Sequence, residues 1–371
     1  MTSSSAVAAP PSEGAALMKI PGAASPTSEP TRWSLFKRGC LRSLQAGLDA
    51  TGIASWYVRA RKVTGATVLN YHSVARPEEA RWVDPRYHLP PSEFERQMRY
   101  LAAHRRPVSL SRLLESMAGG RDLPPGSVVV TFDDGYLDHL TVAAPILVKL
   151  RIPATFFLPT GYVSRVENQW VDRLYSSFLR RTRHQVLVDG EAFDLTRASR
   201  QREAFRRKES VLLITTYSER SAHLRNVEEQ IRPEGSAPKL TMDWDDVRRL
   251  QRISPAFEIG AHSRDHIDMS ALEESDARAE IAACAEDLRR ELGEAPRDFS
   301  FPYERWNPKV REEVRAQGFR SAMGDGPDPL ITRDSDRFAL PRLDPVTHRT
   351  TFGFATSGAY PALSKALTGR A

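Results

Sequence analysis

The stretch from Ser127 to Tyr136 constrains the fold of this 371-residue chain more than any other. Six residues, Ser-Val-Val-Val-Thr-Phe, are followed at once by Asp133, Asp134 and Gly135. A strand buried on both faces has a continuous apolar run, and such strands are typical of parallel sheets covered by helices. In α/β folds the chemistry lies at the carboxyl ends of these strands. Two adjacent carboxylates there indicate a functional site, although an Asp-Asp-Gly turn also has a purely local explanation.

A second polar cluster follows another short apolar strand. This strand is predicted at 257–261, and His262 and His266 come directly after it. If a helical turn starts there, both imidazoles fall on one face, close enough to share one ion. An isolated pair of this kind is usually a solvated helix face. A carboxylate from the first strand end plus two imidazoles, however, makes a three-ligand set that leaves a position for water, as in catalytic zinc sites.

These motifs resemble those of the polysaccharide deacetylases, the NodB homology domain of carbohydrate esterase family 4. The segments 131–135 and 262–266 look like the first two motifs of that family, and 299–304 resembles the third. The resemblance spans about residues 66–345 and implies an α/β fold, a distorted (β/α) barrel of the NodB type with its site at the carboxyl ends of the strands. Three further stretches resemble one branch of the family: 68–74, 145–158 and 339–343.

The resemblance also implies a reaction, the hydrolysis of an N-acetyl group on an amino sugar. By resemblance, Asp134, His262 and His266 hold a divalent metal, for which Zn²⁺ is expected. The metal would polarise the amide carbonyl and lower the pKa of its water, and Asp133 would be the general base. A backbone N–H near Tyr303 would help the metal to stabilise the oxyanion.

The third motif and the end of the chain depart from the family pattern. The Arg that usually braces the catalytic Asp is Ser300 here, and Arg342 is the predicted replacement because guanidinium matches carboxylate geometry; a surface charge at a strand end is the alternative. The final Gly of the motif is Glu304, which puts the backbone of that loop in doubt. The usual late Leu-x-His, whose histidine protonates the leaving amine, has no clear match. His348 and His72 are the candidates, and a solvated or a structural histidine is the alternative for each.

Aromatic and acidic side chains in two places are predicted to bind the sugar. Trp170 would stack on a sugar ring and Asp172 would accept hydroxyl hydrogen bonds, unless they are a core tryptophan and a capping aspartate. Trp306 would form an apolar wall near Tyr303, or simply pack.

The two ends of the chain differ from its centre in composition. Residues 1–30 are rich in Ala, Ser, Pro and Gly and are predicted to be a disordered tail. Residues 31–65 are predicted to be an amphipathic helical lead-in, whose part 31–62 could contact a membrane surface, although packing onto its own domain is more common. Without a signal-peptide core or a membrane span, the sequence predicts a cytoplasmic protein that could be peripheral to the membrane. Residues 346–371 are a C-terminal extension.

Charge and cysteine content argue against a nucleic-acid-binding protein and against a disulfide-stabilised one. The net charge of +6 comes from scattered arginines without a dense basic and aromatic tract, so nucleic-acid binding is not expected. Cys40 and Cys284 lie far apart and are predicted to be free thiols.

From residue 66 the pattern alternates strands and helices, which predicts βαβ units and a parallel sheet. Residues 173–235 interrupt it and are predicted to be a helical insertion with helices near 200–216 and 219–231, either a lid or rim on the active-site face or an unrelated surface excursion. The remaining elements are strands near 67–71, 127–132 and 154–158 and helices near 92–104, 138–150, 243–252 and 271–292.

The sequence therefore predicts a metal-dependent N-deacetylase that acts on a glycan or a glycan precursor in an exopolysaccharide or cell-envelope pathway. The apparent lack of an export signal favours a lipid-linked or nucleotide-linked sugar. The alternatives are a deacylase of a small non-sugar amide on the same scaffold and a catalytically inactive glycan-binding protein.

Overall fold

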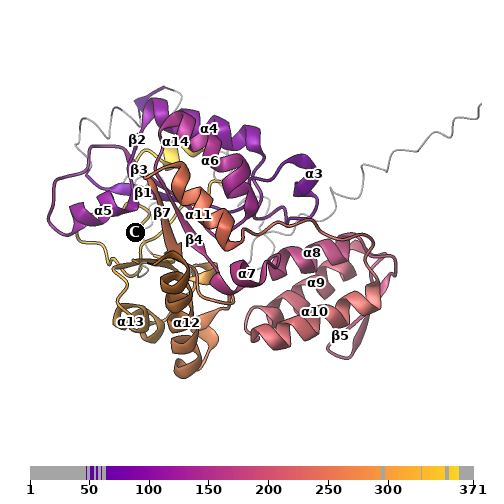
Figure 1. The fold of residues 1–371 in the computed structure, drawn as a ribbon. Coiled ribbons are helices and arrows are strands. Elements are labelled where there is room, and N and C mark those ends of the chain that lie inside the picture. The colour runs from indigo at the N-terminus through magenta and orange to yellow at the C-terminus, as the bar shows by residue number, and fades with distance from the viewer. Residues whose placement is uncertain are drawn as a thin grey trace, which may run out of the picture.

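The computed structural model describes residues 64–346 without 294–296 and 327, then 351–358, and a few isolated positions between 47 and 60. A curved parallel sheet forms its centre and helices surround it (Figure 1). Six strands pair in parallel in the order β1-β3-β4-β7-β8-β9. They are β1 (Ala66–Tyr71), β3 (Ser127–Phe132), β4 (Ala154–Leu158), β7 (Phe257–Ala261), β8 (Asp298–Ser300) and β9 (Ser321–Met323). The short β2 (Arg106–Pro107) also pairs with β3.

The segment 339–343 closes the sheet on itself. Leu340 pairs in parallel with Met323 of β9, and Leu343 pairs in parallel with Leu69 of β1. Backbone hydrogen bonds of 2.8–3.0 Å support both pairings. The prediction of a distorted (β/α) barrel of the NodB type is thereby confirmed, with this segment as its last strand.

The central strands are buried because helices cover them. Every residue of β1, β3 and β4 is buried, as the apolar runs predicted. In α4 the side chains of Phe94, Met98 and Leu101 repeat at helical spacing and are fully buried. The covering helices are α4 (Pro91–His104), α5 (Leu110–Met117), α6 (Ala144–Leu150), α11 (Trp244–Ile253), α12 (Glu274–Leu292) and α13 (Pro308–Ala316).

Local residue preferences account for several helix ends. Helix α4 begins at Pro91, whose missing N–H needs no partner there. Asp243 caps α11 and forms a capping box with Asp246. Gly293 adopts φ +74° after α12, as expected of a glycine at a helix C-terminus.

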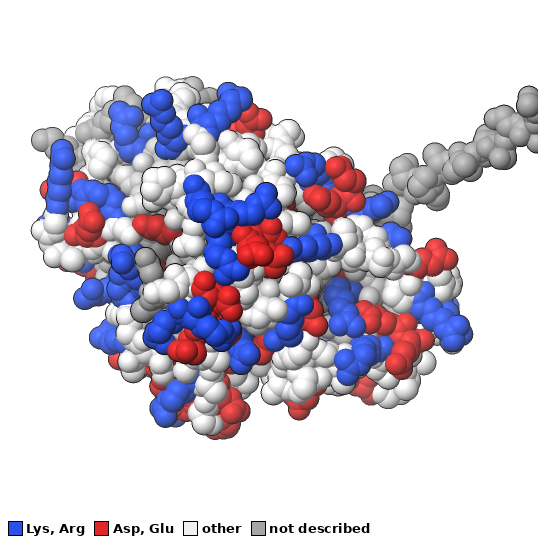
Figure 2. All heavy atoms as spheres, viewed as in Figure 1, with Lys and Arg blue, Asp and Glu red and all other residues white. Residues whose placement is uncertain are grey.

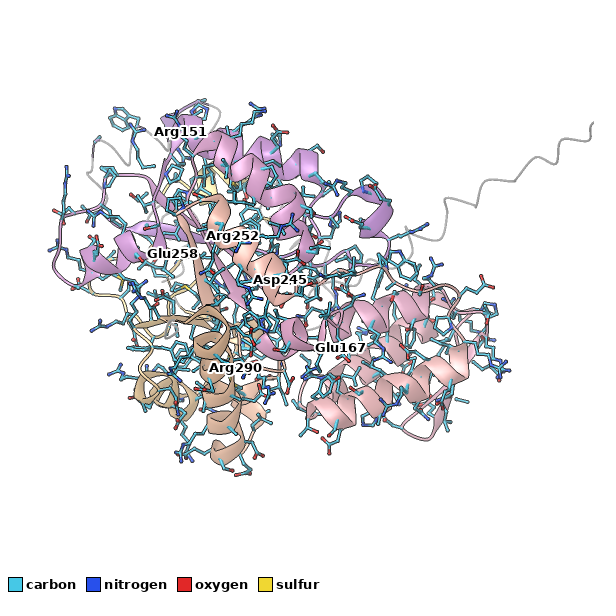
Figure 3. All side chains as sticks on the ribbon, viewed as in Figure 1. Arg151, Glu167, Asp245, Arg252, Glu258 and Arg290 are labelled. Carbon is cyan, nitrogen blue, oxygen red and sulfur yellow. The ribbon has the colours of Figure 1, made fainter. Side chains whose placement is uncertain are left out.

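A lobe with its own hydrophobic core projects from the barrel (Figure 1, lower right). It comprises α8 (Trp170–Leu179), an antiparallel hairpin of β5 (Gln185–Val188) and β6 (Glu191–Asp194), and the helices α9 (Ala198–Leu212) and α10 (Tyr217–Ile231). We expected the two long helices but not the hairpin. Its turn is Asp189-Gly190, both with positive φ, and this dipeptide is a known hairpin signal. Glu167 lies where the barrel continues into the lobe (Figure 3).

The shorter elements connect these parts. They are α3 (Pro77–Ala80), η2 (His139–Ala143), α7 (Thr160–Arg165), η3 (Met269–Ala271), η4 (Pro302–Glu304) and α14 (Phe352–Ala355). In the part of the chain that the structure describes, no helix is both long and apolar enough to span a bilayer. Cationic and anionic side chains are interspersed on the face seen in Figure 2.

Several sequence predictions concern residues that the structure does not describe. The tail 1–30, most of the lead-in 31–65, Cys40 and His348 lie outside the described residues. Cys284 is a buried free thiol. The domain boundaries that we assign from the sequence stay predictions.

Candidate metal centre and active site

Asp133 and Asp134 leave β3 at its carboxyl end. Asp134 has φ +73° and Gly135 has φ +65°, so the chain turns sharply directly after the strand. Aspartate tolerates this left-handed conformation better than most residues, and glycine adopts it freely. The turn leaves both carboxylates buried at the centre of the barrel mouth, next to the end of β7.

His262 and His266 follow β7, but no helix brings them together. Ser263 and His266 both have positive φ, and the Ser263 hydroxyl accepts a hydrogen bond of 3.0 Å from the His266 backbone N–H. This tight turn places the two imidazole centroids 4.8 Å apart. The predicted proximity holds, whereas the helical turn from which we inferred it is absent.

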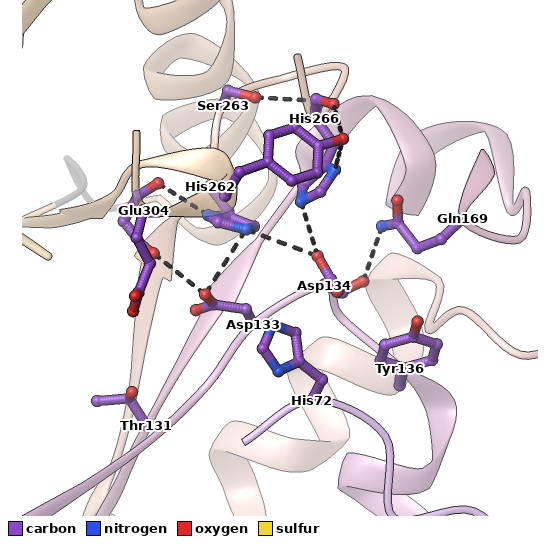
Figure 4. A network of polar contacts seen from close by, with 12 residues as sticks. His72, Thr131, Asp133, Asp134, Tyr136, Gln169, His262, Ser263, His266 and Glu304 are labelled. Carbon is purple, nitrogen blue, oxygen red and sulfur yellow. Dashed lines mark hydrogen bonds and ion pairs between the residues drawn. The ribbon is translucent and has the colours of Figure 1, made fainter. Parts of the chain in front are cut away.

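The two imidazoles and Asp134 face a common point (Figure 4). Asp134 Oδ1 lies 3.0 Å from His266 Nε2 and 3.6 Å from His262 Nε2. One potential ligand atom from each residue lies within 4.8 Å of the others, and all three residues are buried. Asp134 Oδ1 has no hydrogen-bond partner although it is buried. A buried acceptor without a donor, next to two ring nitrogens, is an arrangement that a cation would complete.

Hydrogen bonds on the other ring nitrogens orient both imidazoles. His262 Nδ1 donates to the Ser300 carbonyl at 2.8 Å. Tyr303 donates its hydroxyl to the His266 carbonyl at 3.1 Å, so it accepts from His266 Nδ1 at 2.9 Å. Trp170 Nε1 also donates to this hydroxyl, at 2.9 Å. In the neutral form of each ring these hydrogen bonds place the proton on Nδ1, so that the Nε2 lone pair faces Asp134, as metal ligation requires.

Asp133 is held by Arg342, which comes from the closing segment of the barrel. The two Nη atoms of Arg342 donate to the two oxygens of Asp133 at 2.8 and 2.6 Å. The Ser300 hydroxyl, at the position where the resemblance leads us to expect an Arg, adds a longer hydrogen bond of 3.3 Å. Burial acts to raise the pKa of Asp133, but the charges of Arg342 and His262 outweigh it and lower this pKa to about 2. The Asp133 carboxylate is thus ionised at neutral pH.

The third motif forms a strained turn. Tyr303 has φ +58° and Glu304 has φ +59°, a region in which non-glycine residues are uncommon. Arg342 Nε donates to Glu304 Oε1 at 3.1 Å, so one guanidinium serves two carboxylates. From the sequence we expected a backbone N–H near Tyr303 to stabilise the oxyanion. No sequence pattern indicated that the Tyr303 hydroxyl would hydrogen-bond to His266.

A cavity of about 340 Å³ opens over this centre. His72 and Trp170 line it, together with Asp133, Asp134, the two histidines, Tyr303 and Glu304. The lobe supplies part of the wall through Glu209 and Leu213 near the end of α9. The sequence did not indicate these two residues, because nothing in a charged helix identifies which side chains meet another part of the fold.

Two of the predicted sugar-binding residues do not line this cavity. Asp172 is buried, accepts from the Asp84 backbone N–H and the Tyr136 hydroxyl at 2.8 Å each, and lines a separate cavity beside the lobe. Trp306 stacks on Phe301 and donates Nε1 to the Asp325 carbonyl at 3.0 Å. Asp172 does not cap α8, whose N-cap is Gln169, and a sugar contact by either residue stays a prediction. Trp170, by contrast, lines the cavity at the metal centre while its ring is almost fully buried.

Comparisons with known proteins reveal similarity to deacetylases. The poly-β-1,6-N-acetyl-D-glucosamine N-deacetylase of Escherichia coli strain K12 is 41% identical over 66 residues, which are 18% of this chain and 9% of that protein. The match therefore spans about a tenth of the length of the curated relatives.

Two solved structures share the fold. IcaB from Ammonifex degensii aligns with a TM-score of 0.52 and 21% identity over 79% of this chain and 97% of that one. The Streptococcus pyogenes deacetylase PplD in complex with acetate aligns with a TM-score of 0.50 and 15% identity over 76% and 92%. A family model described as polysaccharide deacetylase matches residues 120–322, more than half of the chain. The chain therefore belongs to the polysaccharide deacetylase family, a family of carbohydrate-acting hydrolases.

Proposed function

We propose that this protein is a metal-dependent N-deacetylase that removes the acetyl group from an amino sugar in a glycan or glycan precursor. One observation carries the proposal: the buried set of Asp134, His262 and His266 lies beside an ionised Asp133 in a single cavity. An inactive binding protein would have no need of this combination of a ligand set and a braced base.

The chain's own residues suit distinct roles in this reaction. Asp134, His262 and His266 would hold the metal, and Zn²⁺ suits two imidazoles and one carboxylate. Such an ion, when bound, polarises the amide carbonyl and lowers the pKa of water. Asp133 would accept the proton, because its low pKa keeps it ionised and Arg342 fixes both of its oxygens.

The leaving nitrogen needs a proton, and the cavity contains a candidate donor. His72 lines the cavity, and its ring centroid lies 5.3 Å from that of Tyr87. We favour His72 over His348 because His72 belongs to the described wall of the site. The backbone N–H of Tyr303 stays the proposed oxyanion donor.

The substrate class follows from the family and from the Escherichia coli relative. That relative's name states an N-deacetylase of poly-β-1,6-N-acetyl-D-glucosamine. We propose an N-acetylated hexosamine glycan for this chain, with a polymer and a lipid-linked precursor as the forms to compare. A cytoplasmic location and a membrane contact through 31–62 are further proposals, which fractionation of cells that express the native protein would test.

Acetate release tests the proposal. Protein stripped of metal and reloaded with Zn²⁺ would be assayed on N-acetylglucosamine oligosaccharides, on lipid-linked sugars and on amides without a sugar ring. Asp133→Asn should lower the rate by about 10²-fold or more, the usual contribution of a general base. Asp122→Asn, at an exposed carboxylate that does not line the cavity, is the matched control. Release from simple amides alone, or from nothing despite bound zinc, would favour the non-sugar deacylase or the binding protein.

A further inference from the structure

Glu304 has no role in the reaction proposed above, although it lies in the wall of the same cavity. It ends the third motif, where the resemblance leads us to expect glycine. Its φ of +59° suits glycine and strains a glutamate. Strained backbone conformations cluster at functional sites.

The Glu304 carboxylate is fixed at one oxygen and open at the other. Oε1 accepts from Arg342 Nε at 3.1 Å, and within the described residues no second donor reaches this carboxylate. Its side chain is 35% exposed, whereas that of Arg342 is 0% exposed. In Figure 4 it lies on the side of Asp133 away from Asp134. A bound sugar unit next to the reacting one would meet this oxygen.

The surrounding charges favour a cation at this position. Asp344 and Asn70 line the same cavity and add a second carboxylate and an amide oxygen. The two arginines of the cavity wall are already engaged: Arg305 pairs with Asp268 at 2.9 Å, and Arg86 pairs with Asp84 and Glu209. A positive group would thus meet a Glu304 carboxylate that shares its one guanidinium, that of Arg342, with Asp133, while the other two guanidinium groups of the wall are paired elsewhere.

We propose that Glu304 is a specificity residue that binds the ammonium group of an amino sugar adjacent to the unit being deacetylated. This inference rests on the proposed function. Hydrolysis of the first N-acetyl group leaves an amine on the chain, and this amine takes up a proton. The reaction therefore generates the cation that Glu304 would bind, and the enzyme would prefer a glycan that already carries one free amine.

Two matched substrates test the inference. One is a fully N-acetylated glucosamine tetramer, and the other is the same tetramer with a single free amine. The full chain, loaded with zinc, would be assayed for acetate release at pH 6.5, below the ordinary pKa of such an amine (~7.7 for an α-amino group). We expect kcat/KM to be about tenfold higher for the tetramer with the amine, the size of one charge-assisted hydrogen bond.

Two variants distinguish the effect of the Glu304 carboxylate from that of its left-handed backbone conformation. Glu304→Gln keeps the size of the side chain, and Glu304→Gly removes the side chain but suits the left-handed backbone, so at least one should fold. Both should bring the ratio of the two kcat/KM values close to one, mainly by raising KM for the tetramer with the amine. Glu312→Gln, on the exposed face of α13, should keep the wild-type ratio.

Other outcomes overturn the inference. A wild-type ratio of one, or a ratio that survives in both variants, would show that Glu304 does not recognise the amine. Equal slowing of both substrates would show that it only positions Arg342. No acetate release from either substrate by the wild-type protein would instead refute the proposed function itself.

Discussion

At the scale of single residues, Arg342 connects two carboxylates of the site. Its Nη atoms bind Asp133 and its Nε binds Glu304, while its own side chain is fully buried. Buried ions depend on their partners because neither is hydrated. The ionised state of Asp133 therefore depends on a residue that follows it by more than two hundred positions.

Replacement of Arg342 should expose this dependence. Arg342→Leu leaves the Asp133 charge buried without its partner, so the free energy of unfolding should fall by about 3–5 kcal/mol. Adding Asp133→Asn removes the unpaired charge, and much of the loss should be regained. Urea unfolding of the single and double variants measures this coupling. Arg333→Leu, which breaks an exposed pair with Asp122, should cost less than about 1 kcal/mol. A double variant no more stable than Arg342→Leu would contradict the argument.

The sequence indicates individual site residues where local pattern and chemistry coincide. Asp134 and His262 each follow an apolar strand, so their positions at one edge of the sheet could be predicted. The side chains of Asp172 and Trp306 are of types that bind sugars, but both form hydrogen bonds with residues from other segments of the chain. Tyr303 presents the converse case, since its hydroxyl acquires a role only when Trp170 and His266 are brought to it.

At the scale of elements, the loop after β1 is tied to η2 by a buried carboxyl group. Asp138 accepts from the Ser73 hydroxyl at 2.7 Å and from the Val74 backbone N–H at 3.0 Å. Burial raises the pKa of Asp138 to about 7. The native state thus keeps a proton that the unfolded chain releases near its ordinary pKa of about 4. This carboxyl group stabilises the fold fully below that pKa, and its contribution is lost as the pH rises towards 7.

Asp138→Asn should remove this pH dependence. The amide can accept from Val74 and donate to Ser73, so the variant should fold. The unfolding free energy of the variant minus that of the wild type should increase by about 3 kcal/mol between pH 4.5 and 7.5, an order-of-magnitude conversion of the shift. Urea unfolding at both pH values measures this difference. A difference that stays constant with pH would mean that Asp138 is already ionised in the native state at pH 4.5.

The same region shows the limit of periodicity. We expected one helix near 138–150, whereas the chain forms a π-helical turn, η2, before α6. The spacing of apolar residues in 138–150 fits both a single α-helix and a π-helical turn followed by an α-helix. His139, inside the turn, is buried and its Nε2 lies 3.0 Å from the His72 carbonyl. A pattern of 3.6 residues contains no information on such a distant contact or on the π-helical turn beside it.

At the scale of the whole molecule, the candidate metal centre joins strands that are not neighbours. Asp134 follows β3 and the two histidines follow β7, with β4 between them in the sheet. An ion that binds only the folded chain adds its binding energy to folding. The metal should therefore stabilise the barrel as a unit.

Zinc should raise the melting temperature of the metal-free protein. At a free concentration of 100 times Kd the gain is about 2.7 kcal/mol, or roughly 5–10 °C for a domain of this size. His262→Ala should abolish most of this shift, and His184→Ala, at an exposed position on the lobe, should keep it. Thermal unfolding with and without zinc measures the effect. An equal shift in His262→Ala would place the binding elsewhere.

The resemblance predicts the closed barrel, but it contains no information on how the lobe meets it. The lobe contributes Glu209 and Leu213 to the cavity and Trp170 to the support of His266. These contacts depend on the relative placement of two separately packed cores, which neither hydrophobic periodicity nor motif spacing encodes.

Closure of the barrel by its last strand has a consequence for the order of events on the ribosome. All three candidate metal ligands have been synthesised once His266 is added, whereas Arg342 is added much later. The groups that orient the two imidazoles follow with Ser300 and Tyr303, and at that point Asp133 still lacks its guanidinium. The braced base appears only when the final strand docks, so completion of the fold and the onset of activity would coincide.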